Sequence, residues 1–184
     1  MVVIGSLRRG SVNAALARAA ITNAPEGMGL VPHDVRDLPF YDGDIEDAGP
    51  PPEVVALHDA IAASDGLVIF SPEYNSSFPA LTKNVVDWFT RPPRAWADKP
   101  VTMAVTTPGG RAGLGLRSHF AATMAHQPIR LFEPLGLGNY RDRLDDDGEF
   151  RNAETVTELV QFLSAFGAFC REAAKPADAQ ASTS

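Results

Sequence analysis

Residues 66–89 read GLVIFSPEYNSSFPALTKNVVDWF, and this stretch decides the fold. Its first five residues, 66–70, show no alternation of apolar and polar side chains, which is typical of a strand buried on both faces. Ala80–Phe89 follows as a predicted helix. A buried strand joined to a helix is the repeating unit of a parallel α/β sheet.

The same alternation extends along the chain in both directions from this stretch. The other predicted strands are Val2–Ile4, 30–35, 101–106 and a less regular one at 129–137, which contains Pro134 and Gly136. The other predicted helices are 13–22, 51–63, 114–125 and 154–171. This order predicts one parallel sheet with helices on both faces. Residues 36–50 are rich in Asp, Gly and Pro and are expected to form a surface loop.

The composition is that of a globular protein. The chain has 184 residues, of which 45% are hydrophobic and 21% charged, and that length can bury a substantial core. We expect a single domain over residues 1–173 and a flexible tail over 174–184. The net charge of −7 disfavours a nucleic-acid partner. We find no signal peptide and no run approaching the ~20 apolar residues of a membrane span, so a cytoplasmic location is expected.

The sequence predicts no metal site. Cys170 is the single cysteine, which excludes a disulfide within the chain and leaves a cysteine-based zinc site unsupported. We expect its side chain to act as a small buried hydrophobe. The four histidines show no ligand spacing, and the acidic run 145–147 lacks the spacing of a calcium-binding loop.

Three loops follow predicted strands, at the sheet edge where parallel α/β sheets bind ligands. The first loop, residues 5–13 (GSLRRGSVN), combines hydroxyl groups, an arginine and a helix start, which suits a phosphate. The second loop, 71–79 (SPEYNSSFP), is stiffened by prolines and carries two aromatic rings, which suits a flat ligand. The third loop, 106–113 (TTPGGRAG), contains glycines that permit close backbone approach.

Each loop has a simpler alternative when considered alone. The first can be a turn capped by Ser11, the third an ordinary glycine turn, and Tyr74 and Phe78 of the second can pack onto the core. No GxxxxGK[ST] or GxGxxG motif is present, so the two best-known nucleotide loops are unsupported. The expected convergence of all three loops on one edge favours a ligand site.

The first two loops resemble motifs of the NADPH-dependent FMN reductase family. GSLRRGSVN is similar to the family pattern GSxRxxSxN, and SPEYNSSFPALTKNVVDW is similar to its PEYNxSxPxxLKNxxDW-like signature. DVRDLPFYDGD, residues 34–44, resembles the family's acidic loop. The resemblance implies a flavodoxin-like fold, a doubly wound five-stranded parallel sheet. Thr82 and the PGGRAGLG run depart from the family pattern.

The resemblance also implies which residues hold FMN. In the first loop these are Ser6, Arg8, Ser11, Val12 and Asn13, around the phosphate. In the second loop they are Pro72, Glu73, Tyr74, Asn75 and Ser76, beside the isoalloxazine ring and ribityl chain. In the third loop they are Thr107, Gly109 and Gly110, at the other edge of the ring. We assign no catalytic side chain, because the flavin supplies the chemistry.

The function implied is transfer of hydride from NADPH or NADH through bound FMN to a small acceptor, by a ping-pong mechanism. Quinones, flavins, azo compounds and metal oxyanions are the acceptor classes. The resemblance further implies a homodimer or homotetramer with Ala80–Phe89 at the interface, where Lys83 and Asp87 pair within the helix or across subunits.

Two other functions remain open. One is a flavodoxin-like electron carrier or flavin-binding regulator that does not react with NAD(P)H. The other is a nucleotide-binding α/β protein without flavin. The PEYN signature of the second loop favours the enzyme.

Overall fold

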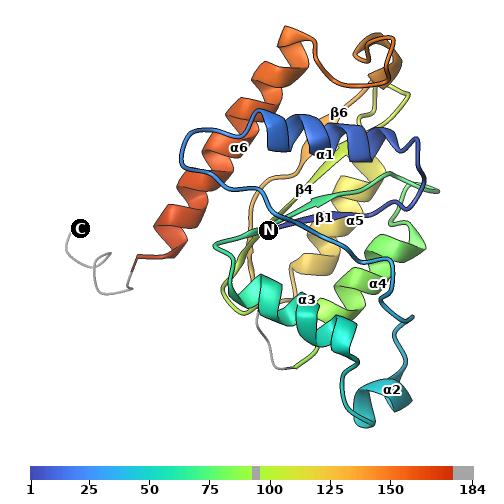
Figure 1. Ribbon diagram of the computed structural model, residues 1–184, viewed down its shortest axis with the longest axis vertical. Helices are drawn as coiled ribbons and strands as arrows, with labels where there is room; N and C mark the ends of the chain where they lie inside the picture. The colour runs from blue at the N-terminus through green and yellow to red at the C-terminus, as the bar shows by residue number, and fades with distance from the viewer. Residues whose placement is uncertain (93–95, 176–184) are drawn as a thin grey trace.

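A parallel β-sheet forms the centre of the molecule (Figure 1). The computed structural model describes residues 1–92 and 96–175. The strands are β1 (Val2–Ile4), β2 (Pro32–His33), β3 (Leu67–Phe70), β4 (Pro100–Thr106), β5 (Arg130–Leu131) and β6 (Leu135–Leu137). Their order is β2-β1-β3-β4-β5, with β6 also pairing with β4. This is the flavodoxin-like order, and it confirms the predicted sheet.

The fifth position of the sheet is divided between two short strands. β5 pairs with the first residues of β4, and β6 pairs with its last three. Pro134 lies between β5 and β6 and has no N–H to donate to the ladder. A side chain at Gly136 would place Cβ 2.3 Å from the carbonyl oxygen of Ala112, so only glycine fits there. The irregular strand predicted at 129–137 is therefore two strands in one position.

Helices cover both faces of the sheet, as predicted. They are α1 (Val12–Thr22), α2 (Gly43–Asp47), α3 (Pro52–Ala62), α4 (Ala80–Phe89), α5 (Leu114–Met124) and α6 (Ala153–Ala173), with a 3-10 helix at Tyr140–Asp142. Residues of α1 and α6 pack in one apolar cluster with Val2 and Val68. Residues of α3, α4 and α5 pack in a second cluster with Val3 and Ile69. Alternate residues of one strand face opposite ways, so the two clusters lie on opposite faces (Figure 1).

The short helix α2 lies within the segment expected to be a surface loop. Asp42 precedes it, and its carboxylate accepts a hydrogen bond of 2.9 Å from the N–H of Asp44. Such a cap stabilises a short first turn. None of the α2 residues is fully buried, and Ile45 alone packs partly against the core. Hydrophobic patterning carries no signal for a helix of this kind.

The strand that anchors the fold is buried on both faces. All four residues of β3 are at most 1% exposed, as the uninterrupted apolar run predicts. Cys170 on α6 is partly rather than fully buried, and burial raises the pKa of its thiol to about 11. Beyond residue 175, the predicted tail lies outside the described residues.

Within the described ranges, none of the helices combines the length and apolar character that crossing a bilayer demands.

Candidate active site

The three loops begin at the ends of three neighbouring strands. β1, β3 and β4 are adjacent and parallel. The N–H of Gly5 donates to the Phe70 carbonyl at 2.7 Å, and the N–H of Ser71 donates to the Ala104 carbonyl at 3.1 Å. The ladder thus continues into the loops, and the predicted convergence on one edge is confirmed.

A fourth segment joins this edge that sequence reasoning missed. The N–H of Thr107 donates to Leu137 at 3.0 Å, and the N–H of Tyr140 donates to the Thr107 carbonyl at 3.2 Å. A Cβ at Gly138 would lie 2.9 Å from the carbonyl oxygen of Gly109, so the segment after β6 lies directly against the third loop. The glycines of the run PLGLG, residues 134–138, are the signal that marks this close approach.

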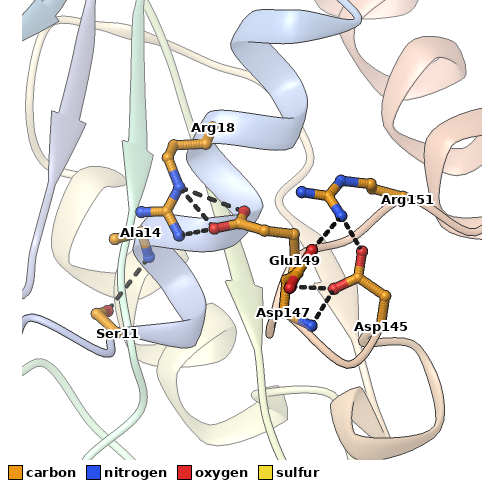
Figure 2. A network of polar contacts seen from close by, with 7 residues as sticks. All are labelled: Ser11, Ala14, Arg18, Asp145, Asp147, Glu149 and Arg151. Carbon is orange, nitrogen blue, oxygen red and sulfur yellow. Dashed lines mark hydrogen bonds and ion pairs between the residues drawn. The ribbon is translucent and has the colours of Figure 1, made fainter.

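The first loop presents the amino end of α1. Ser11 has extended backbone angles, and its Oγ accepts a hydrogen bond of 3.2 Å from the N–H of Ala14 (Figure 2). Ser11 is therefore the N-cap, as predicted, and its own O–H remains a donor. Arg8 is exposed beside it. Free N–H groups, a hydroxyl and a guanidinium together form a donor set suited to a phosphate.

Asn13 is engaged inside the protein rather than at the predicted phosphate. Its Oδ1 accepts from the N–H of Thr106 at 2.9 Å, and its Nδ2 donates to the carbonyl of Thr106 at 3.1 Å. The residue is 4% exposed. Both amide atoms therefore fasten the first loop to the end of β4, and a phosphate contact from Asn13 is left to its backbone N–H.

The second loop contains a tight turn with unusual backbone angles. Tyr74 and Ser77 exchange both backbone hydrogen bonds, at 3.1 and 2.9 Å. Between them Asn75 and Ser76 have φ values of 51° and 58°, the left-handed region that L-residues rarely occupy. Left-handed angles at both central positions are the pattern of a type I′ turn. Ser76, which is neither glycine nor asparagine, holds backbone strain at its position in this turn.

The aromatic residues of the second loop have different environments. Phe78 packs on the core and lies against Phe120, with ring centroids 6.2 Å apart. Tyr74 is 54% exposed at the start of the turn. The alternative in which both rings pack onto the core therefore holds for Phe78 alone.

Glu73 does not point out of the loop with Tyr74. Its Oε1 accepts a hydrogen bond of 2.9 Å from the N–H of Leu116, in the first turn of α5. The carboxylate of Glu73 is thus directed at α5. The predicted contact between Glu73 and a flavin is left to its backbone.

Thr82, which departs from the family pattern, links the first and second loops to α4. Its Oγ1 lies 2.8 Å from the Oγ of Ser71, and both residues are fully buried. A Cβ on Gly5 would lie 2.0 Å from the same Oγ1. The hydroxyl thus occupies the space that a side chain at position 5 would need.

Packing constrains the third loop at its end, Gly113, and does not constrain it at its tip, Gly109. Gly113 has a φ of 68°, and its Cβ would lie 2.5 Å from a methyl group of Val105. At Gly109 the φ is not in the positive range, and no heavy atom lies within 4 Å of the Cβ position. Packing therefore does not require glycine at 109.

Ion pairs fix the polar segment before α6 to α1 (Figure 2). Arg18 pairs with Glu149 at 2.5 Å, and Arg151 pairs with Asp145 at 2.7 Å and with Asp147 at 2.9 Å. The carboxylate of Asp145 accepts the N–H groups of Glu149 and Asp147. The N–H of Glu149 first, and then the charge of Arg151 and the N–H of Asp147, hold the pKa of Asp145 below its ordinary value of 3.8.

No metal site is found within the described parts of the chain, where no group of three His, Cys, Asp or Glu side chains is placed to hold an ion. In the acidic run, Arg151 pairs with the carboxylates of Asp145 and Asp147. Lys83 and Asp87 form an ion pair within α4, which is one of the two arrangements that the sequence left open.

The sequence model of the NADPH-dependent FMN reductases matches residues 1–132 of this chain. The chain belongs to the NADPH-dependent FMN reductase family. A quinone reductase of Pseudomonas putida is 32% identical over 174 residues, which cover 92% of this chain and 93% of the relative. A 2-hydroxy-1,4-benzoquinone reductase of a Burkholderia species is 33% identical over 175 residues, with coverage of 93% and 95%.

A solved structure agrees with this membership. The flavoenzyme NAD(P)H:(acceptor) oxidoreductase FerB of Paracoccus denitrificans superposes with a TM-score of 0.82 at 28% identity, covering 93% of this chain and 96% of FerB. As a member of the FMN reductase family, the chain is an oxidoreductase whose cofactor is FMN and whose reductant is NAD(P)H. Its donor set at the first loop and the open space at Gly109 fit a phosphate joined to a flat ring.

Proposed function

We propose that this chain is an NAD(P)H:quinone oxidoreductase that binds FMN across its first three loops and works by a ping-pong mechanism. The observation that carries the proposal is the convergence of a capped helix start, a strained turn and an open glycine on one sheet edge. Relatives named quinone reductase, in bacteria and in rice, favour a quinone as the acceptor.

The first loop would bind the phosphate of FMN. Ser11 and the N–H groups of α1 donate hydrogen bonds, and Arg8 supplies a charge from the exposed side. Ser6 and Val12 belong to the same site, with Val12 contributing its backbone N–H at the first helical position. The positive end of the helix dipole adds to the attraction of the dianion.

The second and third loops would hold the ring between them. Pro72, Tyr74, Asn75 and Ser76 line one side, and Thr107, Gly109 and Gly110 line the other. Tyr74 offers an exposed aromatic surface, and the loops can direct peptide N–H groups at the ring where negative charge develops. Bound FMN supplies the chemistry by taking a hydride from NAD(P)H and passing it to the acceptor. The protein orients both partners on one open face.

Assembly and location follow as further parts of the proposal. The chain would form one domain over residues 1–173 and act in the cytoplasm as a homodimer or homotetramer that includes α4. The exposed Phe40, at 75%, lies in the segment that packs on α4 through the carbonyl of Pro39, which accepts hydrogen bonds from Asn84 and Trp88. A large exposed ring next to α4 favours this region as the contact between subunits.

The test is reduction of the bound flavin by pyridine nucleotide. We expect the visible absorbance of the purified FMN-loaded protein to bleach without oxygen on addition of NADPH or NADH, and to return on addition of benzoquinone. Parallel lines in double-reciprocal plots at several quinone concentrations would support the ping-pong order, and intersecting lines would contradict it. Titrating NADPH and NADH side by side measures the preference between them.

The electron carrier without NAD(P)H turnover, which the sequence left open, is disfavoured by membership of a family of NAD(P)H-dependent reductases. The net charge of −7 is a feature that the chain shares with acidic flavodoxin carriers. A flavin that dithionite bleaches and that neither nucleotide bleaches would contradict the reductase.

A further inference from the structure

We infer that Glu73 is a positioning residue that joins the second loop to the first turn of α5, and so sets the gap between the two loops that flank the FMN ring. The inference rests on the FMN site proposed above. Glu73 itself need not touch the flavin.

The carboxylate of Glu73 supplies what the start of α5 lacks. The N-cap of α5 is Gly113, which has no side chain to accept a hydrogen bond, and the first turn contains no acidic residue. The first N–H groups of a helix have no partner within the helix. Oε1 of Glu73 accepts one of them, from Leu116, at 2.9 Å across 43 residues of sequence. A negative charge there is also favoured by the helix dipole.

The second loop and the first turn of α5 also pack closely around this hydrogen bond. A Cβ at Gly115 would lie 2.7 Å from the Cβ of Ser76, 2.8 Å from its carbonyl oxygen and 2.8 Å from Oε1 of Glu73. Only glycine allows the strained turn of the second loop to lie against α5. The residues that surround the hydrogen bond therefore form a fitted joint between the two elements.

The far end of the second loop has an attachment of its own. Oγ of Ser77 lies 2.7 Å from Nδ1 of His119, and the ring of Phe78 lies 5.2 Å from the imidazole. Loss of the Glu73 contact is therefore expected to free the part of the loop around Glu73 and leave its end fixed to α5. The fold should survive the substitution.

Charge gives Glu73 a second effect on the cofactor. The carboxylate offsets part of the positive end of the α5 dipole, which starts where the third loop ends. Reduction adds negative charge to a flavin, and nearby positive charge favours the reduced form. Removal of the carboxylate is thus expected to raise the midpoint potential of bound FMN. A role confined to folding would leave this potential unchanged.

The experiment compares Glu73→Ala, Glu73→Gln and the control Glu26→Gln. Glu26 is exposed in the turn after α1, so its variant makes the same charge change away from the loops. For Glu73→Ala we expect a Kd for FMN about tenfold higher and faster amide hydrogen exchange at 113–118 in the FMN-free protein. For Glu73→Gln, which keeps an acceptor oxygen, we expect a Kd within about threefold of the parent and a raised midpoint potential.

The outcomes separate this inference from the proposed function. An unchanged Kd and unchanged exchange in Glu73→Ala would overturn it, as would equal shifts in Glu26→Gln. If Glu73→Ala does not fold, the potential of Glu73→Gln decides, and an unchanged potential counts against the inference. Failure of the parent protein to bind FMN at all would instead overturn the proposed site.

Discussion

At the scale of single residues, the side chain on which phosphate affinity should depend most is Arg8. It lies exposed in the first loop beside the capped start of α1, where a charged hydrogen bond to a dianion is worth about 1.5–3 kcal/mol. We expect Arg8→Ala to weaken FMN binding by that amount, measured by the loss of flavin fluorescence on titration with the FMN-free protein.

Arg9 provides the matched control for this substitution. It is the next residue and is equally exposed, so Arg9→Ala removes the same charge from the same loop. A loss of affinity in both variants alike would indicate a general electrostatic effect, and no loss in Arg8→Ala would remove it from the phosphate site.

What the sequence discloses about single residues depends on how far along the chain their partners lie. The cap at Ser11 was predictable because Ser11 and Ala14 are three residues apart. The amide of Asn13 pairs with Thr106, 93 residues away, and Glu73 pairs with Leu116. Local pattern carries no information on such contacts, so the sequence could not identify the partner of either side chain. Thr82 departs from the family pattern, and its contact with Gly5 is likewise one that the local sequence does not indicate.

At the scale of elements, the turn at 74–77 holds strain that a glycine would relieve. Ser76 has a φ of 58°, which disfavours an L-residue by about 1 kcal/mol or more. We expect Ser76→Gly to raise the free energy of unfolding by about 0.5–1 kcal/mol, after the entropy that glycine loses on folding. Urea unfolding of the FMN-free protein measures it.

The control for this prediction is Ser118→Gly on the exposed face of α5. Glycine within a helix is unfavourable, so the same substitution there is expected to lower the free energy of unfolding. A decrease in both variants would mean that the turn at 74–77 is not strained.

Apolar patterning predicted most helices and strands. It missed the helix α2 and the division of the last strand into β5 and β6. β3 and α4 were predicted to within a residue because each buries a continuous or periodic set of side chains. α2 was missed because it has a polar cap and a single partly buried apolar residue, Ile45, and not a periodic set of them. The division into β5 and β6 was missed because it follows from the contact of Gly136 with the third loop, which no local pattern encodes.

At the scale of the whole molecule, the segment before α6 attaches the last helix to the first. Its ion pairs reach Arg18 on α1 and depend on the turn that the carboxylate of Asp145 organises. The pKa of Asp145 is lower in the folded protein than its ordinary value of 3.8. The ionised form is therefore favoured by folding, and its contribution is present above that value and lost as pH falls through the folded pKa.

We expect Asp145→Asn to lower the free energy of unfolding near neutral pH and to approach the parent protein below about pH 4. Urea unfolding measured across this range checks it. Asp146→Asn is the control, because Asp146 is exposed and makes no ion pair within the described residues. A difference between Asp145→Asn and the parent that persisted at low pH would show that the carboxylate acts without its charge.

The overall architecture and the edge that carries the site followed from the order of strands and helices, because parallel sheets bring their loops to one side. The identity of the cofactor did not follow from that order. It followed from the likeness of the first and second loops to motifs of the family. The third loop departs from the family pattern and indicated least about the site.

The difference between the crowded glycines and Gly109 indicates which of these positions can change without loss of the fold. Gly113, Gly115 and Gly138 are fixed by neighbours that leave no room for a methyl group, so a mutation there damages the scaffold first. A side chain at Gly109 would meet no atom within 4 Å, so a mutation there is expected to leave the scaffold intact. Position 109 is therefore expected to tolerate substitutions that positions 113, 115 and 138 do not.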